Sequence, residues 1–164
     1  TTNYTRIAEK VLNLDDSKIS YLHGRLDLFE NLYTKEIKYL NEFNKTDIIF
    51  PFVFVQSGVK PIISSYQVKE WNKFINYIST SNYIIIIGYS LNSDDEHLNS
   101  ILFSNVEKAK IIFMLYDNYL EKKKNIQSII KNRIEDSKCY YYKCEELIQL
   151  LEKIMKNEPL CSTI

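Results

Sequence analysis

The sequence predicts an α/β fold of the doubly wound type, with a mostly parallel, Rossmann-like sheet and helices on both of its faces. Short β-rich runs alternate with helical stretches along the chain, which is the arrangement that such folds show. Two of the runs, 83–87 (YIIII) and 110–116 (KIIFMLY), are apolar almost throughout. Because a parallel sheet is covered on both faces, unbroken apolar runs are typical of its central strands. We therefore expect these two strands to be adjacent and buried.

The remaining elements follow from local patterns. Further strands are expected at 17–22, 47–55 and 138–142, and Pro51 marks a break or an edge in the second of them. Helical spacing of apolar residues predicts helices at 66–78, 97–103, 118–134 and 145–155. Ser93 followed by Glu96 has the form of a capping box, so Ser93 is the expected N-cap of the second of these helices.

Composition limits the classes of protein to consider. The chain has 164 residues, enough for one domain or part of one, and its 21 basic residues equal its 21 acidic residues. A net charge near zero gives no reason to expect direct contact with nucleic acid. The longest apolar run, 111–116, is too short to cross a membrane. Three cysteines without zinc-type spacing fit a cytoplasmic protein.

Only three glycines are present, and each is expected at the end of a strand. Gly24 follows His23, Gly58 follows the run 47–55, and Gly88 ends the YIIII run. Glycine permits positive φ and close approach of a ligand. Each glycine could equally form no more than a tight turn, but together they favour a binding site at the carboxyl ends of the strands.

Several polar residues could act in such a site. His23 could serve as a general base, although a single histidine is often a structural hydrogen-bonding group. Asn3 could orient a water molecule or a sugar hydroxyl, or it could cap the helix expected at 6–12. Asp117 and Asn118 could hold ribose hydroxyls or cap the next helix. By composition alone, Cys144 is a small hydrophobic residue.

Four segments in order resemble the sirtuin family. They are Thr1-Thr2-Asn3-Tyr4, Leu22-His23-Gly24, Phe50-Pro51-Phe52-Val53-Phe54 and Gly88-Tyr89-Ser90-Leu91. The Gly-Tyr-Ser-Leu variant, followed by Asp94-Asp95, is similar to the bacterial sirtuin-like domains of antiphage defence proteins that degrade NAD. The resemblance covers nearly the whole chain.

The resemblance implies roles for individual residues. Asn3 and His23 match catalytic positions: the asparagine positions the nucleophile and the nicotinamide ribose, and the histidine acts on ribose hydroxyls. The turn at Gly88 and Ser90 matches the segment that contacts the ribose and phosphate of NAD, while Asp117 or Asn118 matches the adenine ribose and Cys144 the adenine. The full set implied to bind NAD comprises Thr1, Asn3, Gly88, Tyr89, Ser90, Asp117, Asn118 and Cys144.

The chain departs from the family pattern in three places. Thr5 stands where the family has an aspartate that holds the nicotinamide carboxamide. No cysteine lies between Gly24 and Pro51, so the family's zinc module is absent and we expect neither zinc nor another metal. The glycine-rich phosphate loop is also missing and is expected upstream of Thr1.

The chain is therefore predicted to be the C-terminal portion of one sirtuin-like domain at 1–157, followed by a frayed tail at 158–164 that begins around Pro159. NAD is the expected substrate or ligand, and the full-length protein is expected to be an NAD glycohydrolase of antiphage defence. The alternatives are a non-catalytic nucleotide-sensing or assembly module and an NAD-dependent deacylase. The expected partners are NAD or a related nucleotide and further copies or fused effector or sensor domains, without nucleic acid or membrane.

Overall fold

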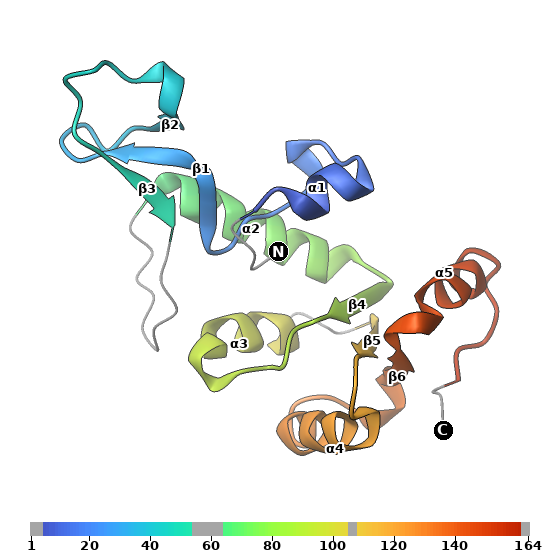
Figure 1. The fold of residues 1–164 in the computed structure, drawn as a ribbon. Helices are drawn as coiled ribbons and strands as arrows, with labels where there is room; N and C mark the ends of the chain where they lie inside the picture. Colours follow the sequence, from blue (N-terminus) through green and yellow to red (C-terminus); the bar gives the residue numbers. More distant parts are fainter. Residues whose placement is uncertain (1–4, 54–63, 105–107, 162–164) are drawn as a thin grey trace. The chain divides into compact units, whose positions relative to one another are not determined.

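The computed structural model describes residues 5–53, 64–104 and 108–161. The chain divides into two compact units, Thr1–Asn76 and Tyr77–Ile164. The described part of each unit contains one three-stranded sheet (Figure 1). We call the first the antiparallel unit and the second the parallel unit, after the pairing of their strands. None of the helices among the described residues has the length and apolar character that crossing a bilayer requires.

The antiparallel unit begins with a short helix, α1 (Ile7–Leu12), and its sheet consists of β1 (Gly24–Asn31), β2 (Ile37–Tyr39) and β3 (Ile49–Val53). The central strand is β1, which pairs antiparallel with both neighbours. Pro51 lies in β3, and β3 is an edge strand of this sheet. An edge was one of the two positions expected for this proline. The helix α2 (Ser65–Thr80) follows and continues across the boundary between the units.

The strand expected at 17–22 is not formed. Residues Asp16–Lys18 form a 3₁₀ turn because the Asp15 carboxylate caps it, accepting a hydrogen bond from the Ser17 backbone N–H at 2.9 Å. The apolar side chains that suggested a strand are buried without strand pairing, among them Ile19 and Leu22. His23 consequently lies in the turn immediately before β1, which begins at Gly24, and not at the carboxyl end of a strand.

The strand expected at 47–55 is present as β3, but it belongs to a different sheet from the YIIII and KIIFMLY runs. Residues 54 and 55 lie outside the described residues, as does Gly58. Antiparallel pairing of Phe29 with Pro51 and of Asn31 with Ile49 fixes the register of β3 on β1.

The parallel unit alternates strands and helices as predicted. The order is β4 (Tyr83–Ile87), α3 (Glu96–Ser104), β5 (Lys110–Leu115), α4 (Tyr119–Ile130), β6 (Cys139–Lys143) and α5 (Leu147–Met155). The strands pair in the order β4-β5-β6, and both pairings are parallel. The predicted adjacency of the two apolar runs is confirmed by the register, in which Ile85 lies opposite Ile112.

The two helices α4 and α5 cover opposite faces of the parallel sheet. On one face, Leu150 of α5 packs with Ile112, Met114 and Tyr142. On the other face, Phe113 stacks on Tyr141 at 5.5 Å between ring centroids, and the Lys123 ammonium of α4 lies 5.4 Å from the centre of the Tyr141 ring. The prediction of a doubly wound sheet with helices on both faces is thereby confirmed.

Burial differs between the two apolar strands. In β5, Ile111–Leu115 are all buried, because this strand has a neighbour on each side and a helix over each face. In β4, Ile84 and Ile86 are buried while Ile87 is 48% exposed. The expectation of full burial therefore fails for β4, which is an edge strand of the sheet formed by the described residues.

Two details near the helix ends differ from the sequence analysis. The side chain that caps the 3₁₀ turn leading into α3 belongs to Asn92, whose Oδ1 accepts from the Asp94 backbone N–H at 3.3 Å, and not to Ser93. Leu160, placed by the sequence in a frayed tail, is buried in the cluster formed by α5 and the sheet. An apolar side chain one residue after Pro159 can contribute to a core even though the helix cannot continue there.

We predict that Gly24→Ala lowers the midpoint of urea unfolding. Gly24 has φ of +87°, and an added Cβ would overlap the Phe52 carbonyl oxygen of β3. The expected cost is about 2 kcal/mol or more. Gly88→Ala is the matched control, because its φ is +67° but nothing lies within 4 Å of an added Cβ. Equal losses in the two variants would show that backbone conformation alone, and not the contact with β3, requires Gly24.

Candidate functional site

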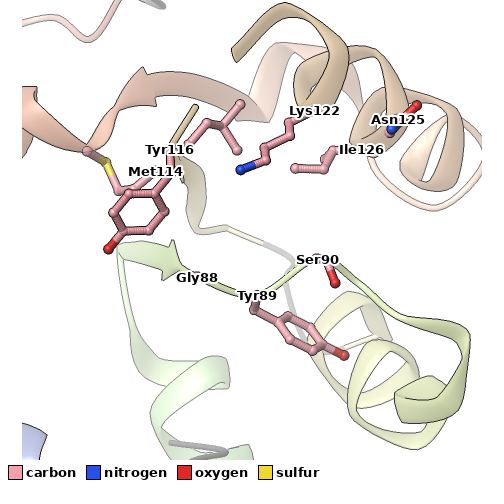
Figure 2. A pocket seen from close by; sticks show the side chains of 9 residues that line it. Gly88, Tyr89, Ser90, Met114, Tyr116, Lys122, Asn125 and Ile126 are labelled. Carbon is pink, nitrogen blue, oxygen red and sulfur yellow. The ribbon is translucent and has the colours of Figure 1, made fainter. Parts of the chain in front are cut away.

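A cavity opens at the carboxyl ends of β4 and β5, entirely within the parallel unit. Its volume is about 310 Å³, which is in the lower range of pockets that bind small molecules. Figure 2 shows the side chains that line it, namely Gly88, Tyr89, Ser90, Met114, Leu115, Tyr116, Lys122, Asn125 and Ile126. The carboxyl ends of parallel strands are where doubly wound folds bind their ligands. This cavity is therefore the candidate binding site.

One wall of the cavity is the turn that follows β4. Gly88 adopts φ of +67°, and its missing Cβ leaves open space, so backbone atoms are accessible there. Leu91 also has positive φ but is 2% exposed, so its side chain anchors the turn in the core. Ser90 lies between these two residues and is exposed. The turn thus presents a free backbone and a hydroxyl to the cavity.

Asn99 of α3 holds this turn in place, and the sequence analysis did not identify it. Its Nδ2 donates to the Asn92 carbonyl at 3.0 Å and to the Leu91 carbonyl at 3.3 Å, and its Oδ1 accepts from the Tyr89 hydroxyl at 2.7 Å. Burial raises the pKa of Tyr89, so its hydroxyl stays protonated and remains a donor. The sequence offers one signal for Asn99, an amide three residues before Leu102 and next to Leu98 in the helix expected at 97–103.

The opposite wall is formed by the end of β5 and the first turns of α4. Tyr116 follows β5, and a hydrogen bond joins its hydroxyl to the Cys144 thiol. Burial raises the pKa of Cys144, which therefore stays a neutral thiol near pH 7 and is not an activated nucleophile. Interaction with Cys144 likewise raises the pKa of Tyr116, whose hydroxyl donates its single proton to the Cys144 sulfur and can accept a hydrogen bond from a ligand.

The cavity carries a single positive charge. Among the described residues that line it, Lys122 has the only side chain that is charged at neutral pH, and no carboxylate is present. Figure 2 shows the Lys122 amino group extending from α4 toward the space beside Tyr116. A site with one cation, a phenol, a hydroxyl and open backbone is suited to an anionic, hydroxyl-bearing ligand.

The structure brings together part of the predicted set. Gly88, Tyr89 and Ser90 line the cavity, and Cys144 adjoins it through Tyr116. Asp117 and Asn118 are exposed and are not among the lining residues. Asn118 occupies the N-cap position of α4 with φ of 56° but makes no capping hydrogen bond through its side chain. A role for these two residues at the ribose remains a prediction.

The predicted catalytic residues lie elsewhere in the chain. Thr1 and Asn3 are outside the described residues, and Thr5, the departure from the family pattern, is exposed. His23 belongs to the antiparallel unit and is 2% exposed. Its burial is compatible with either the catalytic or the structural role, so its contribution to catalysis remains a prediction.

The antiparallel unit contains a charge network that the sequence analysis missed. The Arg25 side chain is buried; its Nε donates to Asp27 at 2.9 Å, and its guanidinium lies 4.9 Å from the centre of the Tyr21 ring. The bonds from Arg25 lower the pKa of Asp27. Tyr21 in turn donates through its hydroxyl to Glu9 at 2.7 Å, and Arg6 pairs with the same carboxylate. Buried charges are tolerated here because each is paired.

We predict that Glu9 makes the antiparallel unit sensitive to acid. Hydrogen bonds from Arg6 and Tyr21 lower the pKa of Glu9 from 4.5 to about 2 in the folded protein. A carboxylate with a lowered folded pKa contributes stability above its unfolded pKa, and that contribution is lost as the pH falls toward the folded pKa. The urea midpoint should therefore fall between about pH 5 and about pH 3 more steeply in the wild type than in Glu9→Gln. Glu121→Gln, at an exposed position of α4, is the control. Parallel pH profiles for wild type and Glu9→Gln would contradict this account.

We predict that Asn99→Ala loosens the turn at 88–92. The variant removes both donors to the turn carbonyls and the acceptor for Tyr89, which is expected to cost about 1–3 kcal/mol of stability. Amide hydrogen exchange of residues 88–92 should accelerate. Ser100→Ala, at the adjacent exposed position, should leave the exchange of this turn unchanged. Unaltered exchange in Asn99→Ala would mean that backbone packing alone holds the turn.

Comparison with known proteins agrees with this architecture. No protein-family profile matches the chain, and no curated protein shows significant sequence similarity to it. Solved structures of Sir2 are similar in fold. A complex of Sir2 with a p53 peptide and NAD⁺ has a TM-score of 0.53 at 11% identity, and the match covers 96% of this chain and 61% of that chain.

Two further Sir2 structures are similar to the same degree. One contains the inhibitor EX-527, 2′-O-acetyl-ADP-ribose and a deacetylated p53 peptide, with a TM-score of 0.53 at 11% identity over 96% of this chain and 62% of that chain. The other contains a deacetylated p53 peptide and 3′-O-acetyl-ADP-ribose, with a TM-score of 0.51 at 11% identity over 96% of this chain and 59% of that chain. Identity this low shows the fold alone. The chain thus has a sirtuin-like, Rossmann-type fold and spans less than two thirds of the length of these Sir2 chains.

Proposed function

We propose that this chain is the nucleotide-binding part of an NAD glycohydrolase, which cleaves the bond between nicotinamide and ribose. The observation that carries the proposal is the cavity at the carboxyl ends of β4 and β5, bordered by the Gly88–Ser90 turn in a sirtuin-like fold. The Sir2 structures with this fold contain NAD⁺ or acetylated ADP-ribose. The Gly-Tyr-Ser-Leu segment followed by Asp94-Asp95 favours a role in bacterial antiphage defence.

The residues of the cavity fit one nucleoside half of NAD. A volume of about 310 Å³ is suited to a nucleoside and not to the complete dinucleotide. The exposed backbone at Gly88 and the Ser90 hydroxyl would bind ribose or phosphate oxygens, and the apolar side chains of Leu115 and Ile126 would contact a base. Binding of this kind fixes the position of the dinucleotide, and positioning supplies much of the rate enhancement in such reactions.

The chemical step would proceed by departure of neutral nicotinamide from C1′ of the ribose. The electron pair of the C1′–N bond leaves with nicotinamide, and the resulting oxocarbenium-like carbon is captured by water, which loses a proton. His23 would act on the ribose hydroxyls, and Asn3 would position the attacking water. The contribution of the protein is then orientation and stabilisation of the developing charge.

Thr5 supports a second candidate, a non-catalytic module that senses or assembles around a nucleotide. In this alternative, threonine in place of the carboxamide-binding aspartate reflects a site that retains ligand binding without turnover. NAD-dependent deacylation is less well supported, because the segment between Gly24 and Pro51 lacks the cysteines of the zinc module. A cytoplasmic location fits either candidate, because the spacing of the three cysteines in the sequence does not form a disulfide framework.

The experiment that separates the first two candidates measures nicotinamide release from NAD by the full-length protein, together with NAD binding by calorimetry. Release of nicotinamide and ADP-ribose supports the glycohydrolase. Binding of NAD without release in any activated state supports the sensing module. Absence of NAD binding would overturn the assignment of the cavity as a nucleotide site.

We predict that His23→Ala lowers nicotinamide release by the full-length protein by about 10²–10⁴-fold, the usual effect of losing a positioned acid–base group. Because His23 is buried, melting temperature must be measured beside turnover. If His23 is structural, its loss lowers stability by about 1–3 kcal/mol while turnover per folded molecule is retained. His23→Gln, which keeps a polar side chain of similar length, should retain more stability than His23→Ala without restoring turnover.

A further inference from the structure

The segment at 19–23, which ends at His23, is buried although it has no regular secondary structure. All five of its residues are buried, and β1 begins only at the next residue, Gly24. In a strand or helix the backbone N–H and C=O groups would be paired locally, but buried irregular backbone needs partners from elsewhere in the fold. The side chains that supply these partners therefore determine the path of the chain at His23.

Two residues of α2, one helical turn apart, supply such partners. The Glu70 carboxylate accepts a hydrogen bond from the Tyr21 backbone N–H at 2.9 Å, and the Glu70 backbone carbonyl accepts one from the Ser20 hydroxyl. The Lys73 ammonium donates to the Ile19 carbonyl at 2.7 Å. Three consecutive residues of the buried segment are thus bonded to α2, which follows them in the chain by about 50 residues.

Glu70 and Lys73 also form an ion pair with each other. Oε1 of Glu70 lies 2.8 Å from Nζ of Lys73, and the two side chains are 4% and 24% exposed. A buried ion pair adds little net stability compared with well-packed apolar side chains, because both charges lose their hydration. The pair does restrain the Glu70 carboxylate, whose other oxygen, Oε2, accepts from the Tyr21 N–H. Its main effect is therefore on the geometry of the segment.

From Tyr21 the chain reaches His23 through a tight turn. The Gly24 N–H donates to the Tyr21 carbonyl at 3.4 Å, which closes this turn. Gly24 lies so close to β3 that an added Cβ would overlap the Phe52 carbonyl oxygen. His23 is therefore held between the contact of Tyr21 with α2 and the contact of Gly24 with β3. A shift of Tyr21 away from α2 would move the imidazole of His23.

We propose that Glu70 is a positioning residue for His23, which it acts on by binding the Tyr21 N–H. The proposal rests on the proposed function, in which His23 acts on the ribose hydroxyls during the chemical step. The candidate nucleotide cavity lies in the parallel unit, whereas Glu70 belongs to the antiparallel unit. Loss of Glu70 should therefore slow the chemical step and leave nucleotide binding unchanged. Misplacement of a reacting group by about 1 Å can lower a rate by about 10²-fold.

The test measures nicotinamide release from NAD by the full-length protein, with the folded fraction determined for each variant. Glu70→Met removes the acceptor for the Tyr21 N–H and should lower kcat by about 10²-fold, with KM for NAD within about twofold of the wild type. Glu70→Gln keeps an oxygen that can accept from this N–H and should retain kcat to within about fivefold. Glu70→Asp, whose carboxylate is one methylene shorter, provides the comparison if Glu70→Met does not fold, and should lower kcat by about tenfold.

Leu28→Ala is the control for loss of stability in the same unit. Leu28 of β1 is 5% exposed, so its truncation should lower the melting temperature, as the loss of a buried side chain does. Because Leu28 makes no hydrogen bond through its side chain to the segment at 19–23, kcat per folded molecule should stay at the wild-type value. A purely structural role for Glu70 predicts the same behaviour for Glu70→Met as for Leu28→Ala.

The remaining outcomes separate the positioning role from the proposed function. An early-melting Glu70→Met variant with wild-type kcat per folded molecule would overturn the positioning role and leave the proposed function intact. A raised KM with unchanged kcat would also overturn it, because Glu70 would then act on binding. A Glu70→Gln variant as slow as Glu70→Met would overturn the role of the Tyr21 N–H. Absence of nicotinamide release by the wild type in any activated state would overturn the proposed function and the positioning role with it.

Discussion

Burial of β5 on both faces is the constraint on which the parallel unit depends. Ile111 and Ile112 are fully buried on opposite faces, and parallel pairing with β4 and β6 satisfies the backbone on both sides. A strand in this position cannot shift by one residue, because a shift would exchange the faces packed against α4 and α5. The carboxyl edge of the sheet, and with it the wall of the cavity formed by Leu115 and Tyr116, is fixed by this register.

The rest of the cavity depends on hydrogen bonds more than on apolar packing. The turn after β4 contains two residues with positive φ, Gly88 and Leu91, and the buried amide of Asn99 holds it against α3. Such a turn keeps backbone groups open to a ligand while it remains ordered. Lys122 then determines the charge of a site whose other lining groups are neutral. Rigid backbone on one wall and a flexible cation on the other is an arrangement that suits recognition of a nucleotide phosphate.

The antiparallel unit is held together by a close approach of two strands and by a network of buried charges. Gly24 allows β1 and β3 to approach closely, and Arg25 beside it is buried between aromatic rings and carboxylates. The same network extends through Tyr21 to Glu9 of α1. Each charged group in this network has a partner, so the unit tolerates buried ions. The same pairing makes the unit sensitive to acid, because protonation of a carboxylate removes its pairing with the cation. His23 lies immediately before this network in the sequence, and a change at His23 therefore has to be judged by stability as well as by turnover.

The sequence by itself determined the parallel sheet and the position of the turn at Gly88–Ser90, because unbroken apolar runs and strand-ending glycines are local signals. It could not determine which strands pair over long distances. The run around Pro51 was expected in the same mostly parallel sheet as the YIIII and KIIFMLY runs, but it forms an antiparallel sheet with β1. Residues 17–22 had the composition of a strand, but the Asp15 carboxylate favours a turn there. Lys122 and Asn99 became functional candidates only in the tertiary structure, because the rotation of a helix against a sheet decides which polar side chain reaches a cavity, and local sequence does not specify that rotation.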